Sequence, residues 1–481
     1  MRSPSGRPRR PRSDQSARTA GQDASLLAEL RPRLRGELVL PGDEAYPRRR
    51  LTFTAEGEPA VIARCRDPQD VRLAIGYARR RGWRISVRSG GHGSTGHGTN
   101  DGGMVIDLSG LNSVQLLDRA AGTVRVGAGA TWSRVAEVLT AEGLAISAGD
   151  TGNVGVGGLL LGGGIGWMVR RYGLALDSLR AAEIVTADGR FIRASESERA
   201  DLFWAIRGGG GNLGILTAVE LVARPHPRVV FGTVRFPGAR VGDVLARWGA
   251  VLPGLPEELT TTVTAVAGPG GRSGQPGPVS VGFCYAGEDA VAAERALASI
   301  LRIGQKLNVE PEVDLAVKPY DQILENVGEP GSVPGMRAVV RSGFCTEVGG
   351  DLAARLTNGL ATIPPLILNV RHLGGAVGRI DPGATAYAYR RAQALVVGIM
   401  MGPALVLDQE GQRFDEFWAG LAPEVFGAYV NFLSNATEAD VAAVYPDPTY
   451  RRIAEVKGRY DPDNVFDRNH NVRPLTRSGD E

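Results

Sequence analysis

The stretch Arg88-Ser89-Gly90-Gly91-His92-Gly93 follows a short strand-like segment at residues 83–87 and places one histidine between glycines. Glycine tolerates positive φ angles and lets a ligand approach the backbone closely. Successive free N–H groups in such a loop form a concavity that suits a phosphate or a pyrophosphate. We therefore expect this first glycine loop (88–93) to hold a phosphate-bearing ligand beside His92.

A second glycine-rich run, DTGNVGVGGLLLGGGIG, spans residues 150–166. Seven of the twelve residues from Gly155 to Gly166 are glycine. Such a segment has too few side chains to build a core, so we expect it to lie against a large, flat ligand. Together the two segments indicate a binding site for a dinucleotide.

Composition limits the class of protein. The 481 residues suffice for two or three domains. Apolar residues make up 43% of the chain and charged residues 22%, as is typical of a globular protein. The formal net charge of +3 lies mostly in the first 24 residues, where six arginines outweigh Asp14 and Asp23. The remaining chain is near neutral, which argues against a nucleic-acid-binding protein.

Residues 1–27 are rich in Pro, Ser and Arg and predict a disordered basic tail. No apolar segment follows PRRPR (8–12), so its likeness to a twin-arginine export signal fails. No uncharged apolar run is long enough to span a bilayer. Cys65, Cys284 and Cys345 lack CxxC spacing, which disfavours a disulfide framework or a zinc site. We expect a cytoplasmic protein with no metal site and no membrane contact.

Local signals predict an α+β unit over residues 30–226. Asp67 and Pro68 are typical of a helix start, and Gly82 of its end. Asp188-Gly189 is typical of a hairpin turn. We further expect strands at 84–87, 104–108, 123–126, 182–186, 191–194 and 215–222, and helices at 131–142 and 201–206. The prolines at 225 and 227 indicate a boundary.

Residues 227–424 have a different composition. A long Pro/Gly turn at 269–278 precedes a strand at 279–285, and amphipathic helices are expected at 288–301 and 351–361. This pattern predicts a second domain with an antiparallel sheet backed by helices. The last segment, 425–475, is rich in asparagine and polar aromatic residues.

Several stretches carry a family resemblance when they are read in order. They are RSGGHG (88–93), VIDLS (105–109), VGVGGLLLGGGIGWMVRRYGL (154–174), DLFWAIRGGGGNLGILT (201–217), GGA (374–376), TAYAYR (385–390), YVNF (429–432) and YDPDNVFDRNHNV (460–472). The chain resembles the berberine-bridge-enzyme-like branch of FAD-linked oxidases, in the vanillyl-alcohol oxidase/p-cresol methylhydroxylase superfamily. The resemblance implies a bipartite FAD-binding domain (30–226 and 425–475) of the p-cresol methylhydroxylase (PCMH) type around an inserted substrate domain (227–424).

The resemblance also implies FAD as the cofactor, with His92 bonded to the 8α-methyl carbon of the flavin. Such a bond needs a neutral imidazole beside the ring, on a backbone that passes close to it. His97 is the only nearby rival. The other residues that the resemblance implies for FAD binding are Arg88, Ser89, Gly90, Gly91, Gly93, Gly149, Thr151, Val154, Gly155, Gly157, Gly158, Gly162, Gly164, Gly214, Ile215, Asn431 and Asn469.

Two positions of the second glycine run bear on flavin chemistry. Many relatives make a second link from a cysteine to the flavin C6 carbon, and this chain has Thr151 at that position. A single covalent bond through His92 is therefore expected. Val154 resembles the position that controls oxygen access, where a small β-branched residue favours an oxidase.

The acid/base residue is harder to assign. Many relatives have a tyrosine at the last position of a Y-x-N-Y motif, where this chain has Phe432, and Ile165 replaces a pocket tyrosine. The remaining candidates are Tyr429, Tyr387 and Tyr389. If TAYAYR (385–390) is a strand, Tyr387 and Tyr389 share one face.

We therefore expect an FAD-dependent oxidase that acts on an alcohol, an amine or an activated C–H bond of a hydrophobic small molecule. O2 would regenerate the flavin and release hydrogen peroxide. Two alternatives stay open: a dehydrogenase with another electron acceptor, and a flavoprotein that has lost catalysis and acts as a binding protein. A Rossmann nucleotide site is disfavoured because the required strand–loop–helix unit and acidic residue are missing.

Overall fold

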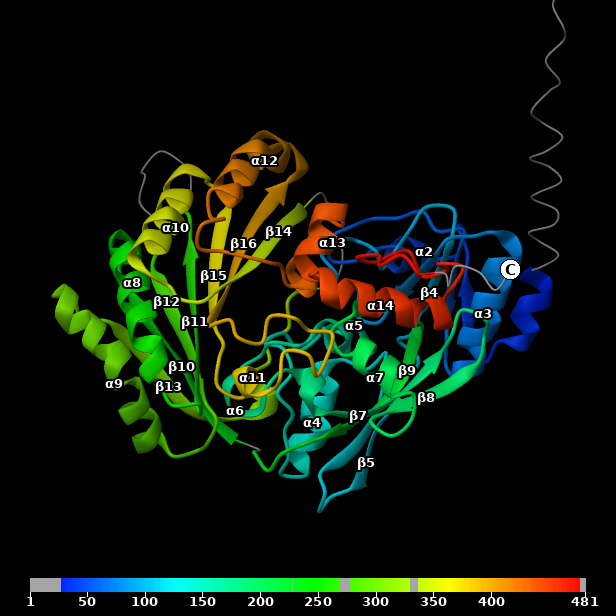
Figure 1. The fold of residues 1–481 in the computed structure, drawn as a ribbon, viewed down its shortest axis with the longest axis horizontal. Helices are drawn as coiled ribbons and strands as arrows, with labels where there is room; N and C mark the ends of the chain where they lie inside the picture. Colours follow the sequence, from blue (N-terminus) through cyan, green and yellow to red (C-terminus); the bar gives the residue numbers. More distant parts are fainter. Residues whose placement is uncertain (1–26, 227, 269–276, 329–335, 476–481) are drawn as a thin grey trace, which may run out of the picture.

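The computed structural model describes residues 27–226, 228–268, 277–328 and 336–475. Their strands form three sheets, joined and covered by helices (Figure 1). Residues 1–26 of the expected tail and 269–276 of the expected turn lie outside the described residues.

The first sheet has the order β1-β2-β4-β3, with β2, β4 and β3 parallel. Its strands are β1 (Glu37–Val39), β2 (Val61–Arg64), β3 (Ile85–Arg88) and β4 (Met104–Asp107). Helix α3 (Pro68–Arg81) joins β2 to β3. It starts and ends where the sequence predicts, because Asp67 accepts a hydrogen bond from Asp70 N and Gly82 takes a φ of 62°. The first glycine loop therefore begins at the carboxyl end of a parallel strand.

The second sheet is antiparallel, with the order β5-β6-β9-β7-β8. Its strands are β5 (Val114–Asp118), β6 (Thr123–Gly127), β7 (Leu179–Val185), β8 (Phe191–Ser195) and β9 (Ile215–Val222). The accompanying helices are α2 (Tyr46–Arg49), α4 (Trp132–Ala141), α5 (Val156–Gly162), α6 (Val169–Tyr172) and α7 (Ala200–Ile206). Each strand and helix expected from 30 to 226 is present, with ends that differ by at most three residues.

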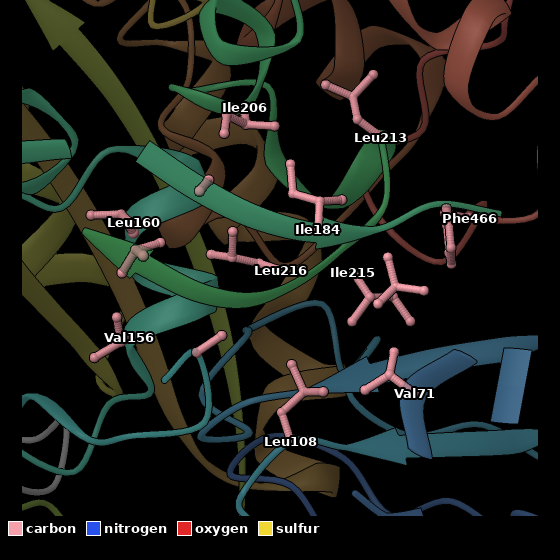
Figure 2. Packing of buried hydrophobic residues seen from close by; sticks show 14 of the residues in the cluster. Val71, Leu108, Val156, Leu160, Ile184, Ile206, Leu213, Ile215, Leu216 and Phe466 are labelled. Carbon is pink, nitrogen blue, oxygen red and sulfur yellow. The ribbon is translucent and has the colours of Figure 1, made fainter. Parts of the chain in front are cut away.

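A shared hydrophobic core joins these two sheets (Figure 2). Val71 and Leu108 from the first sheet region pack in the same cluster as Val156 and Ile215. Phe466, from the C-terminal segment, belongs to this cluster as well. The chain end therefore packs onto the first folded unit, beside α13 (Glu438–Val444) and α14 (Asp447–Tyr460).

The third sheet has seven antiparallel strands in the order β13-β10-β12-β11-β15-β16-β14. They are β10 (Arg228–Phe236), β11 (Leu259–Val266), β12 (Val279–Tyr285), β13 (Glu312–Pro319), β14 (Met336–Cys345), β15 (Leu366–His372) and β16 (Ala394–Pro403). One face is covered by α8 (Val241–Val251), α9 (Ala290–Leu307), α10 (Gly350–Thr362) and α12 (Ala404–Ala419), and α11 (Ala376–Arg379) lies near α6 (Figure 1). The expected antiparallel sheet backed by helices is confirmed.

Two expectations for this region are wrong. The helix expected at 288–301 continues to Leu307, where Asn308 ends it in a left-handed conformation. TAYAYR (385–390) is not a strand. The segment is held in an irregular conformation by two contacts: the Arg390 guanidinium is buried against Asp177, and Ala386 N donates to Trp204 O.

None of the helices in the ranges described above has the length and apolar composition needed to cross a bilayer.

Candidate active site

The two glycine segments touch each other through their backbones. A Cβ atom at Gly90 would lie 2.3 Å from Gly155 N, and one at Gly155 would lie 2.1 Å from Ser89 Oγ. The Ser89 hydroxyl donates to Ala128 O at 2.6 Å, which holds the first loop against the second sheet. Glycine is required at both positions because any side chain would push the segments apart.

His92 lies where these segments meet. Its ring stacks on Phe53, with ring centroids 3.7 Å apart. Burial lowers the pKa of His92 to about 4, and a hydrogen bond with the Asn153 backbone opposes this shift. Nε2 is buried and has no hydrogen-bond partner among the described residues. His92 is therefore a neutral imidazole with an unpartnered nitrogen, which fits attachment to a flavin.

Other polar residues of this region are held by the protein itself. The Arg88 guanidinium is buried and donates to Asp107 from Nε and Nη2 at 3.1 and 2.8 Å, so its side chain ties β3 to β4. His97 is also buried, and burial together with the charge of Arg468 lowers its pKa to about 4. Thr151 Oγ1 donates to Asp150 Oδ1 at 3.1 Å.

Several glycines predicted to bind the cofactor are needed for packing. A Cβ atom at Gly162 would lie 2.2 Å from Asn431 Oδ1, and one at Gly164 would lie 2.4 Å from the Cβ of Ala175. A Cβ atom would also lie close to a neighbouring residue at three more of these glycines: Gly149 (next to Leu159), Gly157 (next to Ala128) and Gly214 (next to Ile184). Gly93 and Gly158, by contrast, have nothing within 4 Å of a Cβ position. These two glycines border open space, which suits a ligand.

Two of the three candidate tyrosines, Tyr387 and Tyr429, lie close to each other, and Tyr429 contacts the second glycine run. Tyr429 Oη accepts hydrogen bonds from Gly164 N at 2.8 Å and from Asn431 Nδ2 at 2.9 Å. The rings of Tyr387 and Tyr429 lie 6.2 Å apart, and Tyr387 Oη is buried without a partner in the described part of the chain. Burial raises the pKa of Tyr429 to about 12 and that of Tyr387 well above its usual value.

Tyr389 points elsewhere. Its hydroxyl donates to Ala443 O, and its ring stacks on Phe344 at 4.6 Å. Because TAYAYR is irregular, the expectation that Tyr387 and Tyr389 share a strand face does not hold. Ile215 is buried in the core, and Asn469 Nδ2 donates to Gly211 O and Phe466 O.

A small pocket lies between the second glycine run and the third sheet. Its lining residues are Asp150, Ile165, Gly166, Trp167, Val169, Thr260, Thr262, Arg371 and His372. Sequence reasoning identified Ile165 as a pocket position but missed Arg371, which pairs with Asp150 at 2.6 Å. The available signal was the pair of polar residues Asn369 and Arg371 at alternate positions of a strand whose residues 366–368 and 370 are apolar.

Comparison with known proteins explains this arrangement. A family described as "FAD binding domain" matches residues 59–195, and one described as "Berberine and berberine like" matches residues 428–473. The (R)-6-hydroxynicotine oxidase of Paenarthrobacter nicotinovorans is 30% identical over 463 residues, covering 92% of this chain and 97% of that protein. The chain belongs to the berberine-bridge-enzyme-like FAD-linked oxidases.

Solved structures agree with this FAD-linked oxidase family in fold. The crystal structure of 6-hydroxy-D-nicotine oxidase from Arthrobacter nicotinovorans superimposes with a TM-score of 0.80 at 28% identity, covering 92% of this chain and 98% of that one. A glucooligosaccharide oxidase from Acremonium strictum, with a 6-S-cysteinyl, 8α-N1-histidyl FAD, has a TM-score of 0.79 at 23% identity and covers 94% and 99%. The predictions of an FAD cofactor, an oxidoreductase and a PCMH-type fold are thereby confirmed.

The residues of this FAD-linked oxidase fit the cofactor. The unpartnered nitrogen of His92 and the open glycines Gly93 and Gly158 offer an attachment point and a backbone surface. Cys65, Cys284 and Cys345 are buried in the hydrophobic clusters. The predicted domain boundaries and the individual binding residues stay predictions.

Proposed function

We propose that this FAD-linked oxidase oxidises an alcohol, an amine or an activated C–H bond of a largely hydrophobic small molecule. Bound FAD supplies N5 as the hydride acceptor and is reoxidised by O2. The substrate loses a hydride and a proton, and O2 takes up two electrons and two protons to form hydrogen peroxide. The supporting observation is the pocket wall, to which Ile165, Trp167 and Val169 contribute apolar side chains.

We also propose that His92 makes the only covalent bond to the flavin. Burial keeps its imidazole neutral and therefore nucleophilic at neutral pH. Thr151 has no thiol, and its hydroxyl is already bonded to Asp150. The three cysteines are buried, and burial raises the pKa of each thiol, which keeps them unreactive.

Tyr387 and Tyr429 are the proposed proton-handling pair. Tyr429 Oη already accepts two hydrogen bonds, so only its own proton remains for a further partner. Tyr387 Oη has no partner among the described residues, which leaves it free to exchange a proton with a substrate. Because its pKa is raised, Tyr387 is protonated at neutral pH and gains basic character only as the pH increases.

Peroxide release tests the proposal. The purified holoenzyme would be screened in an oxygen electrode against benzylic alcohols, cyclic amines and gluco-oligosaccharides. We expect O2 uptake and peroxide with an aromatic alcohol or amine, and little with the oligosaccharides. Reduction of a dye acceptor without O2 uptake would indicate a dehydrogenase instead. A flavin that is photoreduced and then fails to reoxidise in air would indicate a flavoprotein without oxidase activity.

A further inference from the structure

The face of the third sheet opposite its helices carries a ladder of polar side chains. On β15, Leu368 and Val370 point into the helix-covered core, so Asn369 and Arg371 point to the other face. Asn369 Nδ2 donates to Thr264 Oγ1 of β11 at 2.9 Å, and Arg371 Nε donates to Asn369 Oδ1 at 2.7 Å. The ladder fixes the orientation of the Arg371 side chain.

Arg371 lies at the end of this ladder, in the wall of the pocket. Its side chain is only 13% exposed, and its guanidinium lies 4.8 Å above the ring of Phe432. Nη2 faces Asp150 at 2.6 Å, while Nη1 has no assigned partner among the described residues. A planar guanidinium with donors to spare is suited to bind a carboxylate through two hydrogen bonds.

Thr260 gives an independent indication of a polar ligand. It lines the same pocket, is only 4% exposed, and its Oγ1 has no hydrogen-bond partner in the described part of the chain. A buried hydroxyl without a hydrogen-bond partner destabilises the protein. A ligand with a hydrogen-bonding group would remove that destabilisation.

Asp150, the one carboxylate among the described residues that line the pocket, is already engaged. Asp150 Oδ2 forms an ion pair with Arg371, and Oδ1 accepts a hydrogen bond from Thr151. Arg170, next to Val169 of the pocket wall, is 4% exposed and forms no ion pair with a described carboxylate. Burial lowers the pKa of Arg170 to about 10, so it stays positively charged at neutral pH. Its guanidinium donates to Leu255 O and Leu373 O and lies near Glu257 and Glu258, so Arg371 is the one cation among the described residues that line the pocket.

We infer that the substrate carries a carboxylate, and that Arg371 and the Thr260 hydroxyl bind it while the apolar part lies against Ile165 and Trp167. This inference rests on the proposed function and narrows its substrate class to hydrophobic acids that also bear an oxidisable alcohol or amine. Arg371 is then a positioning residue that determines specificity.

Ligand binding to the holoenzyme tests this inference. Benzoate and its neutral analogue benzamide would be titrated while the flavin absorption spectrum is followed. We expect benzoate to bind about tenfold more tightly than benzamide, as one charge-assisted hydrogen bond allows. R371Q should abolish this preference, and R371K should keep part of it. T260V should weaken benzoate binding without changing benzamide binding.

Arg171 provides a matched control. It pairs with Glu258 and so also joins the region after the second glycine run to the third sheet, but it lies outside the pocket. R171Q should leave the preference for benzoate unchanged. If R371Q does not retain flavin, the benzoate and benzamide affinities of R371K and T260V are compared with those of the wild type instead.

Three results would overturn the inference: no preference for benzoate in the wild type, an unchanged preference in R371Q, or equal losses in R371Q and R171Q. The last result would mean that the Asp150–Arg371 ion pair only connects the second glycine run to the third sheet and does not bind a carboxylate. Reoxidation of the photoreduced flavin in air is measured on the same samples. A protein that prefers benzoate but does not reoxidise would contradict the proposed oxidase activity while retaining the carboxylate site.

Discussion

His92 and His97 show how surroundings separate two residues of one type. Both are buried, and burial lowers the pKa of each to about 4. His92 stacks on Phe53, keeps one nitrogen unpartnered and lies beside Asn153 of the second glycine run. The nearest charges to His97 are those of Arg468, His470 and Arg84, which disfavour a second positive charge. A neutral imidazole is therefore common to both histidines. The position of His92 beside the second glycine run is what favours it as the residue proposed to bond the flavin.

The first prediction concerns this pair. Acid precipitation should leave the yellow colour in the pellet of the wild type and of H97A, and release it from H92A, because the proposed covalent bond to the flavin is made by His92. The measurement is flavin absorbance in pellet and supernatant. Colour released from the wild type would show that FAD is bound without a covalent link.

The second prediction concerns the tyrosines. Y387F should lower kcat by about 10²–10⁴-fold, the usual contribution of a proton-transferring group. Because burial raises the pKa of Tyr387 well above its usual value, the phenolate fraction and with it kcat/KM should keep increasing with pH through the alkaline range in the wild type, and this increase should be absent in Y387F. Y389F is the control: it loses only the hydrogen bond to Ala443 O, so its kcat should change little. Equal losses in both variants would argue against a role for Tyr387 in proton transfer.

At the scale of elements, the two glycine segments form one surface. The first follows β3 and the second leads into α5, and their contact at Gly90 and Gly155 leaves no room for a side chain. Gly155 has a φ of −72°, which any residue adopts, so space and not backbone strain requires glycine there.

The third prediction follows from that contact. G155A should destabilise the protein by about 1–3 kcal/mol, because the added Cβ atom forces the segments apart, and should reduce the flavin content. G158A is the matched control for stability within α5, where a Cβ atom has nothing within 4 Å; its flavin content is not compared, because Gly158 borders the surface proposed for the cofactor. It should be neutral or stabilise by up to about 1 kcal/mol through helix propensity. Thermal unfolding and the flavin-to-protein absorbance ratio measure both effects; an unchanged Tm in G155A would contradict the packing argument.

At the scale of the molecule, buried charges join the flavin-binding unit to the segment after β15. Arg390 is fully buried and donates to both oxygens of Asp177 at 2.8 Å, and its Nη2 also donates to Thr385 Oγ1. Asp177 also accepts a hydrogen bond from Leu174 N. The pair therefore holds the TAYAYR segment, and with it Tyr387, against the residues that follow the second glycine run.

The fourth prediction tests this pair. R390M should lower the free energy of unfolding by about 3–5 kcal/mol, because it leaves the Asp177 carboxylate buried without its partner. R379M is the control: it removes the pair with Glu257, whose side chains are 59% and 37% exposed, and should cost at most about 1 kcal/mol. Urea unfolding followed by tryptophan fluorescence measures both. Similar losses in the two variants would show that burial of the Arg390 pair has no special effect.

The sequence by itself determined the local features of this protein. Asp67 and Gly82 delimit α3, the glycine segments predict a close backbone approach, and the ordered motifs identify the FAD-linked oxidase family. These signals are readable because capping, turns and glycine conformation depend on neighbours within a few residues.

Only the tertiary structure decided which side chains meet in the pocket. The alternation in TAYAYR predicted a strand, but the buried Arg390 pair holds the segment as a loop and turns Tyr389 away from Tyr387. The pairing of Arg371 with Asp150 depends on the register of β15 in the third sheet and on the packing of that sheet against the second glycine run. Such contacts join residues far apart along the chain, so they follow from the packing of whole elements and not from local sequence.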